Sequence, residues 1–408
     1  MSERIMRKRK GDIMLRGKFV VIGVTGGIAA YKIPNLARLL IKAGAEVQVI
    51  MTENAQNFIT PFTFETLTKN KCLTDTFDRN FTYSVEHVAL AKRADMIVIA
   101  PASADVIAKA AHGIADDMLT TVLLAATCRK LIAPAMNHNM YHNPIVEDNM
   151  SRLRRFGFEF VGPVCGMLAN GDTGDGRMSD EEEIFDYIEK ELSHTKDFEG
   201  KKVLISAGAT EEAIDPVRCI TNHSSGRMGL ALAKAAAARG ACVTVIRGRC
   251  EVKFPPYLKI KDAASAEDMY RAAANEDFDI YIGAAAVADY TPAEYSDNKI
   301  KKSDNDTTLR LTRTKDILGY LGSNKKEGQF LCGFSMETEN MLENSVKKLK
   351  EKNLDMIAAN NLKTEGAGFK CNTNVLTLID KDGAEELPKM SKLEAAHRLL
   401  DKIAEKIK

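Results

Sequence analysis

The sequence predicts an α/β protein built from two doubly wound, Rossmann-like domains in tandem, each with a mainly parallel sheet. Short β-branched runs alternate with segments of helical periodicity, which is typical of strand–helix–strand units. This alternation restarts near the middle of the chain. The 408 residues also exceed the ~250–300 at which a single hydrophobic core stops growing. Two domains are therefore expected.

The first half opens with the strand-like run KFVVIGV at residues 18–24, which leads through two glycines into a helical segment over residues 28–43. The strand AEVQVIMT follows, and further strands are expected at 94–103, 130–137 and 158–163, with helices between them. Short apolar strands that alternate with helices favour a parallel sheet covered on both faces.

The second half begins after SHTKDFEG, a polar stretch without periodicity at residues 193–200. KKVLISAGAT at 201–210 predicts a strand, MGLALAKAAAARG a helix and ACVTVIRG the next strand. Further strands are expected at 280–290, 329–336, 354–360 and 375–380. The predicted organisation is a basic tail over 1–16, a first domain over 17–192, a linker over 193–200 and a second domain over 201–408.

Composition restricts the possible partners. The chain has 57 Lys and Arg against 56 Asp and Glu, a net charge of +1, so no long-range field favours nucleic acid or a membrane surface. Its eight cysteines form no CxxC pair, and no apolar signal segment or run of ~20 apolar residues is present. We expect a reduced, cytoplasmic protein that acts on small molecules.

Two glycine-rich entrances to helices are candidate anion sites, because the carboxyl ends of parallel strands carry the ligands of open α/β sheets. The first, GVTGG at 23–27, lacks the GxGxxG pattern and the acidic residue of a dinucleotide site. A mononucleotide phosphate fits better, held by glycine amides and hydroxyls of the set Thr25, Gly26, Gly27, Thr52 and Ser103. Alternatively, the glycines only permit a tight turn.

Five ordered motifs extend this interpretation. They are GVTGGIAAYK, VEHVALAKRAD, APASADVIAKAAHGIADDMLT, PAMNHNMY and GMLANGDTGDGRM. Together, over roughly residues 17–190, they resemble the phosphopantothenoylcysteine decarboxylases of the FMN-dependent cysteine decarboxylase group. The resemblance implies that FMN oxidises the substrate thiol to a thioaldehyde, which accepts the electrons left by CO2. The reduced flavin then returns hydride, and the product is the saturated thiol.

The same resemblance assigns roles to residues. His87 becomes the active-site histidine and Asn137 the amide that holds the substrate carboxylate. The glycine-rich motif becomes a flap over the substrate, with Arg177 and Met178 at its end as substrate contacts. Asn170 stands where many members have the proton-donating cysteine. Because asparagine is not a useful general acid, Cys165, another group or water would have to donate.

His138 and His142 have the i, i+4 spacing that could bind a metal on a helix. The sequence offers no apparent third ligand, so no metal is expected there.

The second half resembles the phosphopantothenate:cysteine ligases over roughly residues 200–400. The matching segments are SAGATEEAIDPVRCITNHSSGRMG at 206–229, AAAVADYTP at 284–292, NKIKK at 298–302, GFSMETE at 333–339 and AAN at 358–360. The resemblance implies that the carboxylate of 4'-phosphopantothenate is activated as an acyl-cytidylate, with CTP and Mg2+, before cysteine attacks.

Here the phosphates would be cradled at a helix N-terminus by Ser206, Gly208, Ser224, Ser225 and Gly226. Asp289 is a tentative Mg2+ ligand at a strand end. The resemblance makes Lys299 the catalytic lysine with Lys301 beside it, Asn222 the residue that stabilises the acyl intermediate, and Arg218 the contact to the carboxylate or phosphate. Ala286 and Phe334 would contact substrate or base. The segment RTKDILGY replaces the usual Asn-Pro-Asp stretch, which leaves open whether CTP or ATP is preferred.

These features predict a bifunctional enzyme of coenzyme A biosynthesis. The alternatives are a dehydrogenase with duplicated NAD(P)-binding Rossmann domains, a flavin prenyltransferase and a non-catalytic scaffold. The resemblance also implies a homo-oligomer with trimeric decarboxylase contacts and dimeric ligase contacts, and a dodecamer as the resulting hypothesis.

Overall fold

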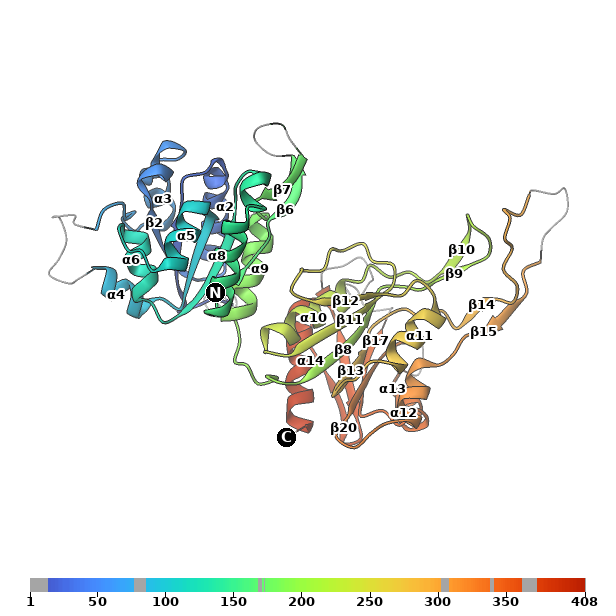
Figure 1. Ribbon diagram of the computed structural model, residues 1–408. Coiled ribbons are helices and arrows are strands. Elements are labelled where there is room, and N and C mark those ends of the chain that lie inside the picture. Colours follow the sequence, from blue (N-terminus) through green and yellow to red (C-terminus); the bar gives the residue numbers. More distant parts are fainter. Residues whose placement is uncertain are drawn as a thin grey trace. The chain divides into compact units, whose positions relative to one another are not determined.

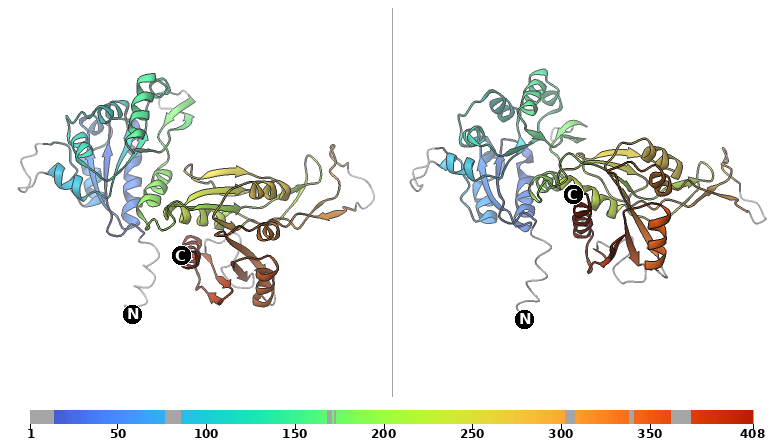
Figure 2. Two further views of the ribbon diagram at one scale, coloured as in Figure 1. Left: turned by 60° about the horizontal axis from the view of Figure 1, so that its bottom comes forward. Right: turned by 90° about the horizontal axis from the view of Figure 1, so that it is seen from below.

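The chain divides into two compact units, Met1–Ser193 and His194–Lys408, drawn in Figures 1 and 2. The computed structural model describes residues 14–76, 86–167, 171, 173–301, 308–337, 341–361 and 373–407. Each unit is an α/β domain with a largely parallel sheet, as the sequence predicts. In these ranges, no helix has the length and apolar character to cross a membrane.

The first unit contains a five-stranded parallel sheet. Its strands are β1 (Phe19–Val24), β2 (Glu46–Met51), β3 (Met96–Ala102), β4 (Arg129–Pro134) and β5 (Glu159–Phe160). Their order in the sheet is β2-β1-β3-β4-β5. The chain therefore reverses its direction of growth between β1 and β3. In open α/β sheets of this order, such as flavodoxin, the ligand lies at this switch point.

Helices cover both faces of this sheet. α2 (Ile33–Lys42) packs against α3 (Pro61–Thr68) and α9 (Glu181–Leu192). A second group, α4 (Glu86–Arg93), α5 (Ala104–His112), α6 (Met118–Ala125) and α8 (Pro144–Arg155), shares a buried cluster that includes Ile97, Val106, Leu119 and Leu153. The short helices η1 (Ile28–Lys32), η2 (Glu53–Asn57) and α7 (His138–Tyr141) follow strand ends, and β6 (Val164–Met167) pairs with β7 (Thr173–Arg177) as a separate hairpin.

The second unit has an eight-stranded sheet of order β12-β11-β8-β13-β16-β17-β19-β20. The parallel strands are β8 (Lys202–Ala207), β11 (Cys242–Arg247), β12 (Lys259–Asp262), β13 (Ile280–Gly283), β16 (Phe330–Glu337) and β17 (Met356–Asn361). β19 (Leu376–Asp380) and β20 (Gly383–Glu386) add antiparallel to them. The six parallel strands have the dinucleotide-fold order 3-2-1-4-5-6, with its switch point between β8 and β13.

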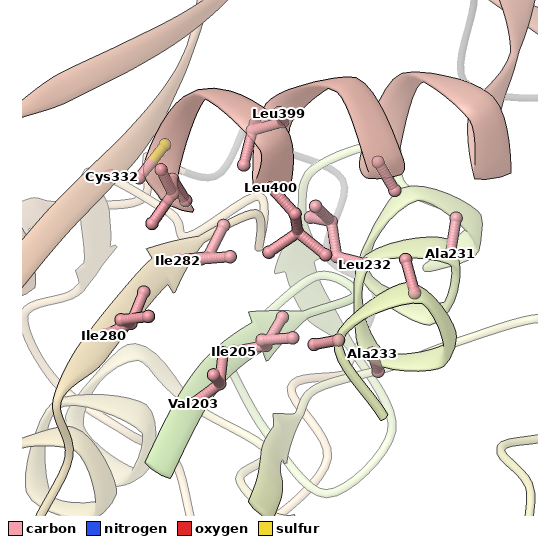
Figure 3. Close-up of a cluster of buried hydrophobic side chains, with 14 of the residues drawn as sticks. Val203, Ile205, Ala231, Leu232, Ala233, Ile280, Ile282, Cys332, Leu399 and Leu400 are labelled. Carbon is pink, nitrogen blue, oxygen red and sulfur yellow. The ribbon is translucent and has the colours of Figure 1, made fainter. Parts of the chain in front are cut away.

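On one face of this sheet, α10 (Arg227–Ala238) packs against α14 (Lys392–Lys406). Figure 3 shows Leu232 of α10 and Leu399 and Leu400 of α14 over strand residues such as Ile205 and Ile282. Gly229 allows a close approach of α10 to the sheet, because a Cβ on this residue would lie 2.4 Å from the Cβ of Ala207. Because both residues are small, the start of α10 packs directly against the end of β8.

The opposite face carries α11 (Ala266–Ala274), α12 (Ile317–Ser323) and α13 (Met341–Glu351). Two hairpins stand apart from the sheet, β9 (Glu211–Ala213) with β10 (Cys219–Thr221) and β14 (Tyr290–Pro292) with β15 (Leu311–Arg313). The short strands β18 (Thr373–Asn374) and β21 (Met390–Ser391) pair just before α14.

Candidate active sites

A cavity of about 570 Å³ opens at the carboxyl ends of β1, β3 and β4 in the first unit. Glycines and the start of α5 form one part of its wall, and the turn after β4 with the β6–β7 hairpin forms another. Its lining residues are Gly26, Gly27, Ile28, Ala29, Tyr31, Lys32, Ser103, Ala104, Ala135, Met136, Asn137, Met140, Met167, Gly176, Arg177 and Met178. The wall is largely apolar, as suits a planar ring system.

The switch point is held together by Thr25. Its hydroxyl donates to the carbonyl of Pro101 at 2.7 Å and accepts from the amide of Ser103 at 2.9 Å. The side chain is fully buried and does not line the cavity. Thr25 thus joins the ends of β1 and β3, whereas the sequence interpretation gave its hydroxyl to a phosphate.

The two glycines of the turn have different surroundings. A Cβ on Gly26 would lie 2.6 Å from the Cβ of Asn54, so the turn leaves no room for a side chain. At Gly27 the nearest atom to such a Cβ would be Pro101 Cγ, 4.0 Å away. Gly26 permits the tight turn because it has no side chain. Gly27 also has no side chain, which keeps the cavity open beside the turn.

The donors around this turn fit an anionic group. Ser103 lines the cavity and is the N-cap of α5, whose first turn provides a positive dipole end. Thr52, which follows β2, does not line the cavity, and its buried hydroxyl has no hydrogen-bond partner among the described residues. A buried hydroxyl without a partner is costly. A flavin phosphate bound at this turn would supply the missing acceptor.

Asn137 lines the same cavity as the glycine turn and lies in the segment that follows β4. Its Oδ1 caps α7 by accepting from the amide of Asn139 at 2.9 Å. The cap fixes the side-chain amide, and its NH2 group has no protein partner within the described ranges. Asn137 therefore presents a neutral donor to the cavity, which suits a carboxylate.

The β6–β7 hairpin supplies the other wall. The amide of Met136 donates to the carbonyl of Gly176 at 3.0 Å, and Gly176 has a φ of +137°. Arg177 Nη2 and Lys32 Nζ both contact Asp180 Oδ1, at 3.1 and 2.9 Å. The hydrogen bond from Lys32, followed by its charge and that of Arg177, lowers the pKa of Asp180. These contacts hold two cations at the rim of the cavity, and Met178 is buried in its wall.

Two residues that the resemblance singled out are not placed in this cavity. His87 is half-buried on α4 and does not line it. Asn170 lies outside the described residues. Cys165, a candidate replacement for the proton donor, is exposed on β6 and also does not line the cavity.

The second unit has two adjoining cavities of about 550 and 440 Å³. They share the wall residues Ala285, Val287, Asp289, Phe334, Ser335 and Lys348, and so form two lobes of one cleft. The cleft lies at the carboxyl ends of the neighbouring strands β8 and β13, since Ser206 is the last residue but one of β8 and Ala285 follows β13. This is the ligand position expected for the strand order.

The smaller lobe contains the start of α10. Asn222, Ser224, Ser225, Gly226 and Ala286 all line it. Gly226 is the N-cap with a φ of +76°, which frees the first amides of a 12-residue helix toward the lobe. Asn222 Nδ2 donates to the carbonyl of Val287 at 3.1 Å, which ties this loop to the segment after β13.

Ser206 lines the larger lobe of the cleft, whereas Gly208 does not. The Ser206 hydroxyl accepts from Tyr281 Oη at 3.2 Å and from the amide of Ala285 at 3.4 Å. Burial raises the pKa of Tyr281 to about 12, so the phenol stays a neutral donor. Gly208 has a φ of +87° and lines neither lobe; a Cβ there would lie 2.5 Å from the carbonyl oxygen of Arg249.

Sequence reasoning gave no site role to the four cations of the larger lobe, which are Arg313, Lys315, Lys348 and Lys352. Lys315 contacts Glu267 at 3.0 Å and Lys352 contacts Asp316 at 2.8 Å. Lys348 and Lys352 are spaced i, i+4 near the end of α13, a pattern that puts both on one helix face. The pattern is visible in the sequence, but the position of α13 beside the cleft is a property of the fold.

Lys299, Lys301 and Arg218 lie outside both lobes. Arg218 donates to Asp215 and to the carbonyl of Ile300 at 2.7 Å, and the amide of Ile300 donates to Asp215 at 3.1 Å. The Arg218 hydrogen bond holds the pKa of the Asp215 carboxyl well below its usual range. The lysine segment is therefore fastened to the β9–β10 hairpin loop.

Asp289 is exposed and borders both lobes. In the described ranges, one group of three side chains could hold a metal ion by itself: His138, His142 and Asp175 of the first unit. The third ligand that was not apparent in the sequence is thus present, because β7 brings Asp175 to the end of α7.

Comparisons with known proteins agree with this division. Residues 9–193 match the family model described as Flavoprotein, and residues 198–407 match the DNA/pantothenate metabolism flavoprotein C-terminal domain. The coenzyme A biosynthesis bifunctional protein CoaBC of Bacillus subtilis is 47% identical over 96% of this chain and 98% of its own. The CoaBC of Haemophilus influenzae is 44% identical over 96% of this chain and 98% of its own.

Among solved structures, the C-terminal domain of a CoaBC protein is 38% identical and covers 52% of this chain and 98% of its own, with a TM-score of 0.44. Near-full-length identity to the CoaBC proteins, with both family models matched in order, decides the assignment: this chain belongs to the family of the bifunctional coenzyme A biosynthesis proteins, with a flavoprotein domain followed by a pantothenate-metabolism domain.

Proposed function

We propose that the chain converts 4'-phosphopantothenate to 4'-phosphopantetheine in two steps. The second unit would join 4'-phosphopantothenate to cysteine at the expense of CTP, and the first unit would decarboxylate the product with FMN. The observation that carries this proposal is the pair of unlike crevices: one is apolar with a fixed amide donor, and the other has four cations in its larger lobe and a helix N-terminus in its smaller lobe. A dehydrogenase is not favoured, because the comparisons match flavoprotein families.

In the ligase step, the amides at the start of α10 would hold a phosphate, and the cations of the larger lobe would neutralise the triphosphate. Phe334 borders both lobes and would lie against the base. Asn222 would hold the acyl group near Ala286. Mg2+ is commonly held by one or two carboxylates together with substrate phosphates, and Asp289, which borders both lobes, would supply one of them.

In the decarboxylase step, FMN would supply the electron sink for the departing carboxyl group. The chain's own contribution is positioning. Asn137 would donate to the substrate carboxylate without the charge of a salt bridge, so CO2 can leave. Arg177 and Lys32 at the rim would meet the substrate phosphate. Ser103, Gly27 and Thr52 would hold the phosphate of FMN, and the hairpin with Met178 would exclude water.

Since His87, Lys299 and Arg218 lie outside the cavities of their own chain, we propose that a second copy brings them to the sites. This agrees with the expected trimeric contacts of the decarboxylase and dimeric contacts of the ligase, and with a dodecamer. Light scattering coupled to size exclusion checks it; a monomer with full activity would contradict it.

We also propose a cytoplasmic location, in keeping with its eight cysteines without a CxxC pair.

The test is mass spectrometry of products after incubation of the protein with 4'-phosphopantothenate, cysteine, Mg2+ and either CTP or ATP. We expect 4'-phosphopantetheine with CTP. Accumulation of phosphopantothenoylcysteine would support the ligase alone and contradict the decarboxylase. Accumulation of the decarboxylated product in its oxidised form, before the reduced flavin returns hydride, would mean that no group replaces the proton-donating cysteine for which Asn170 stands. Equal turnover with ATP would contradict the CTP preference.

A further inference from the structure

A group of metal-ligating side chains lies beside the first cavity and is not used by the proposed reaction. A ring nitrogen of His138, one of His142 and a carboxylate oxygen of Asp175 lie within 4.8 Å of one another. His142 Nε2 is 3.2 Å from Asp175 Oδ2, and the two imidazole centroids are 4.6 Å apart. We propose that these side chains bind a divalent transition-metal ion of the zinc class, which fastens the β6–β7 hairpin to α7.

The backbone fixes the position of the third ligand. A Cβ on Gly176 would lie 2.2 Å from the carbonyl oxygen of Met136, and one on Gly174 would lie 2.9 Å from His138 Nδ1. The glycines on either side of Asp175 thus let β7 lie directly on the turn that carries Asn137 and His138. Main-chain packing therefore holds the backbone of Asp175 at the end of α7, and its carboxylate contacts His142 from there.

The ligand set suits zinc. Zinc takes imidazole nitrogen and carboxylate oxygen at about 2.0–2.2 Å, which places neighbouring ligand atoms roughly 3.4 Å apart in a tetrahedral site. The His142–Asp175 pair is already at 3.2 Å. His142 Nδ1 lies 3.4 Å from Glu147 Oε1. A carboxylate at the second nitrogen of a metal-ligating histidine orients the ring and strengthens the ligand.

Metal binding has a structural consequence at His138. Its Nδ1 accepts a hydrogen bond from the amide of Asp175 at 3.2 Å. A neutral imidazole has one ring nitrogen with a free lone pair, so a metal bound through either nitrogen of His138 leaves Nδ1 without a lone pair for this amide. Binding would exchange one hydrogen bond for a metal–nitrogen bond and release the Asp175 amide. Zinc should therefore change amide exchange locally.

The test uses the full chain, first stripped with a chelator and then dialysed against zinc chloride, with bound zinc measured by elemental analysis. We expect wild type to bind one zinc more per chain than His142→Gln or Asp175→Asn when all are dialysed against the same zinc buffer. Because thiols also bind zinc, the difference between variants is the readout. The controls His112→Gln and Asp148→Asn keep the same residue types in the same unit and should match wild type.

Hydrogen exchange with mass spectrometry locates the site. With zinc, wild-type peptides that cover residues 138–147 and 173–177 should change their exchange, with faster exchange at the Asp175 amide. These peptides should not respond in Asp175→Asn, which also serves if His142→Gln does not fold. Equal zinc content in wild type and both ligand variants, or zinc binding with no change in these peptides, would overturn the proposal.

Discussion

At the scale of single residues, Thr52 allows a test in which stability and ligand affinity move in opposite directions. Its buried hydroxyl has no partner within the described ranges. Thr52→Val removes this group at nearly constant volume. The flavin-free protein should be unchanged or more stable by about 1 kcal/mol. The affinity for FMN should fall roughly tenfold or more, since hydrogen bonds to charged groups contribute ~1.5–3 kcal/mol.

Urea unfolding of flavin-free protein and titration with FMN, followed by flavin fluorescence, measure both quantities. Thr60→Val is the control, because Thr60 is an exposed N-cap at the start of α3. Unchanged FMN affinity in Thr52→Val would remove this hydroxyl from the flavin site.

Gly226 tests how tightly the start of α10 is packed. It has a φ of +76°, and a Cβ there would lie 2.5 Å from Cys250 Sγ. Gly328 has a similar φ of +82° but nothing within 4 Å. Gly328→Ala should therefore cost only the backbone strain of about 1–2 kcal/mol, and Gly226→Ala should cost more, about 3 kcal/mol.

Chemical denaturation compares the two glycine variants. Adding Cys250→Ala to Gly226→Ala should recover the excess, because it removes the sulfur. Equal destabilisation by both single variants would mean that the helix start moves aside freely and does not hold a fixed cradle.

At the scale of whole elements, the strands and the glycine-rich turns could be predicted from the sequence, whereas the contacts between distant elements could not. Runs such as KFVVIGV and KKVLISA predicted β1 and β8 because burial on both faces makes central strands apolar. Glycine patterns predicted the two entrances for a similar local reason. The partners of Thr25 and the approach of α13 could not be predicted, since they depend on strand order and on distant segments, 78 residues away in the case of Thr25 and Ser103.

Asp175 illustrates the same limit. The i, i+4 histidines are a local signal, but their third candidate ligand is 33 residues from His142 and arrives through the hairpin. Lys299 shows the opposite case, in which a motif was recognised although the chain does not bring it to its own cleft. Local patterns identify chemistry, whereas distant packing decides which groups meet.

α14 should make the second unit sensitive to acid. His397 on this helix stacks on His194 with ring centroids 3.8 Å apart, near Arg239, Asp197 and Asp401. Burial, followed by the charges of His194 and Arg239, lowers the pKa of His397 from its ordinary 6.5 to about 3. The unfolded chain binds this proton first, so stability is full above pH 6.5 and is lost as the pH falls toward 3.

His397→Gln should remove this part of the acid sensitivity, about 1–3 kcal/mol after allowance for partial exposure. Urea unfolding at a series of pH values, followed by a probe in the second unit, measures it. His223→Gln, at an exposed histidine of the same unit, should keep the wild-type slope. An unchanged slope in His397→Gln would contradict the role of the pair.

At the scale of the whole molecule, the structure argues that the two activities are separable by substitution. The first cavity is lined by residues 26–178 and the second cleft by residues 206–392, so no lining residue is shared between the units. Asn137→Ala removes the fixed donor from the first, and Asn222→Ala removes from the second the side chain that bonds Val287. Each variant is the control for the other.

Asn137→Ala should accumulate phosphopantothenoylcysteine, with decarboxylation lowered 100-fold or more if its amide holds the carboxylate in the transition state. Its CTP-dependent pyrophosphate release should match wild type. Asn222→Ala should lose pyrophosphate release yet decarboxylate added phosphopantothenoylcysteine at the wild-type rate. Because each crevice is formed at the switch point of its own sheet, loss of both activities in either variant would mean that the units depend on each other for their structure.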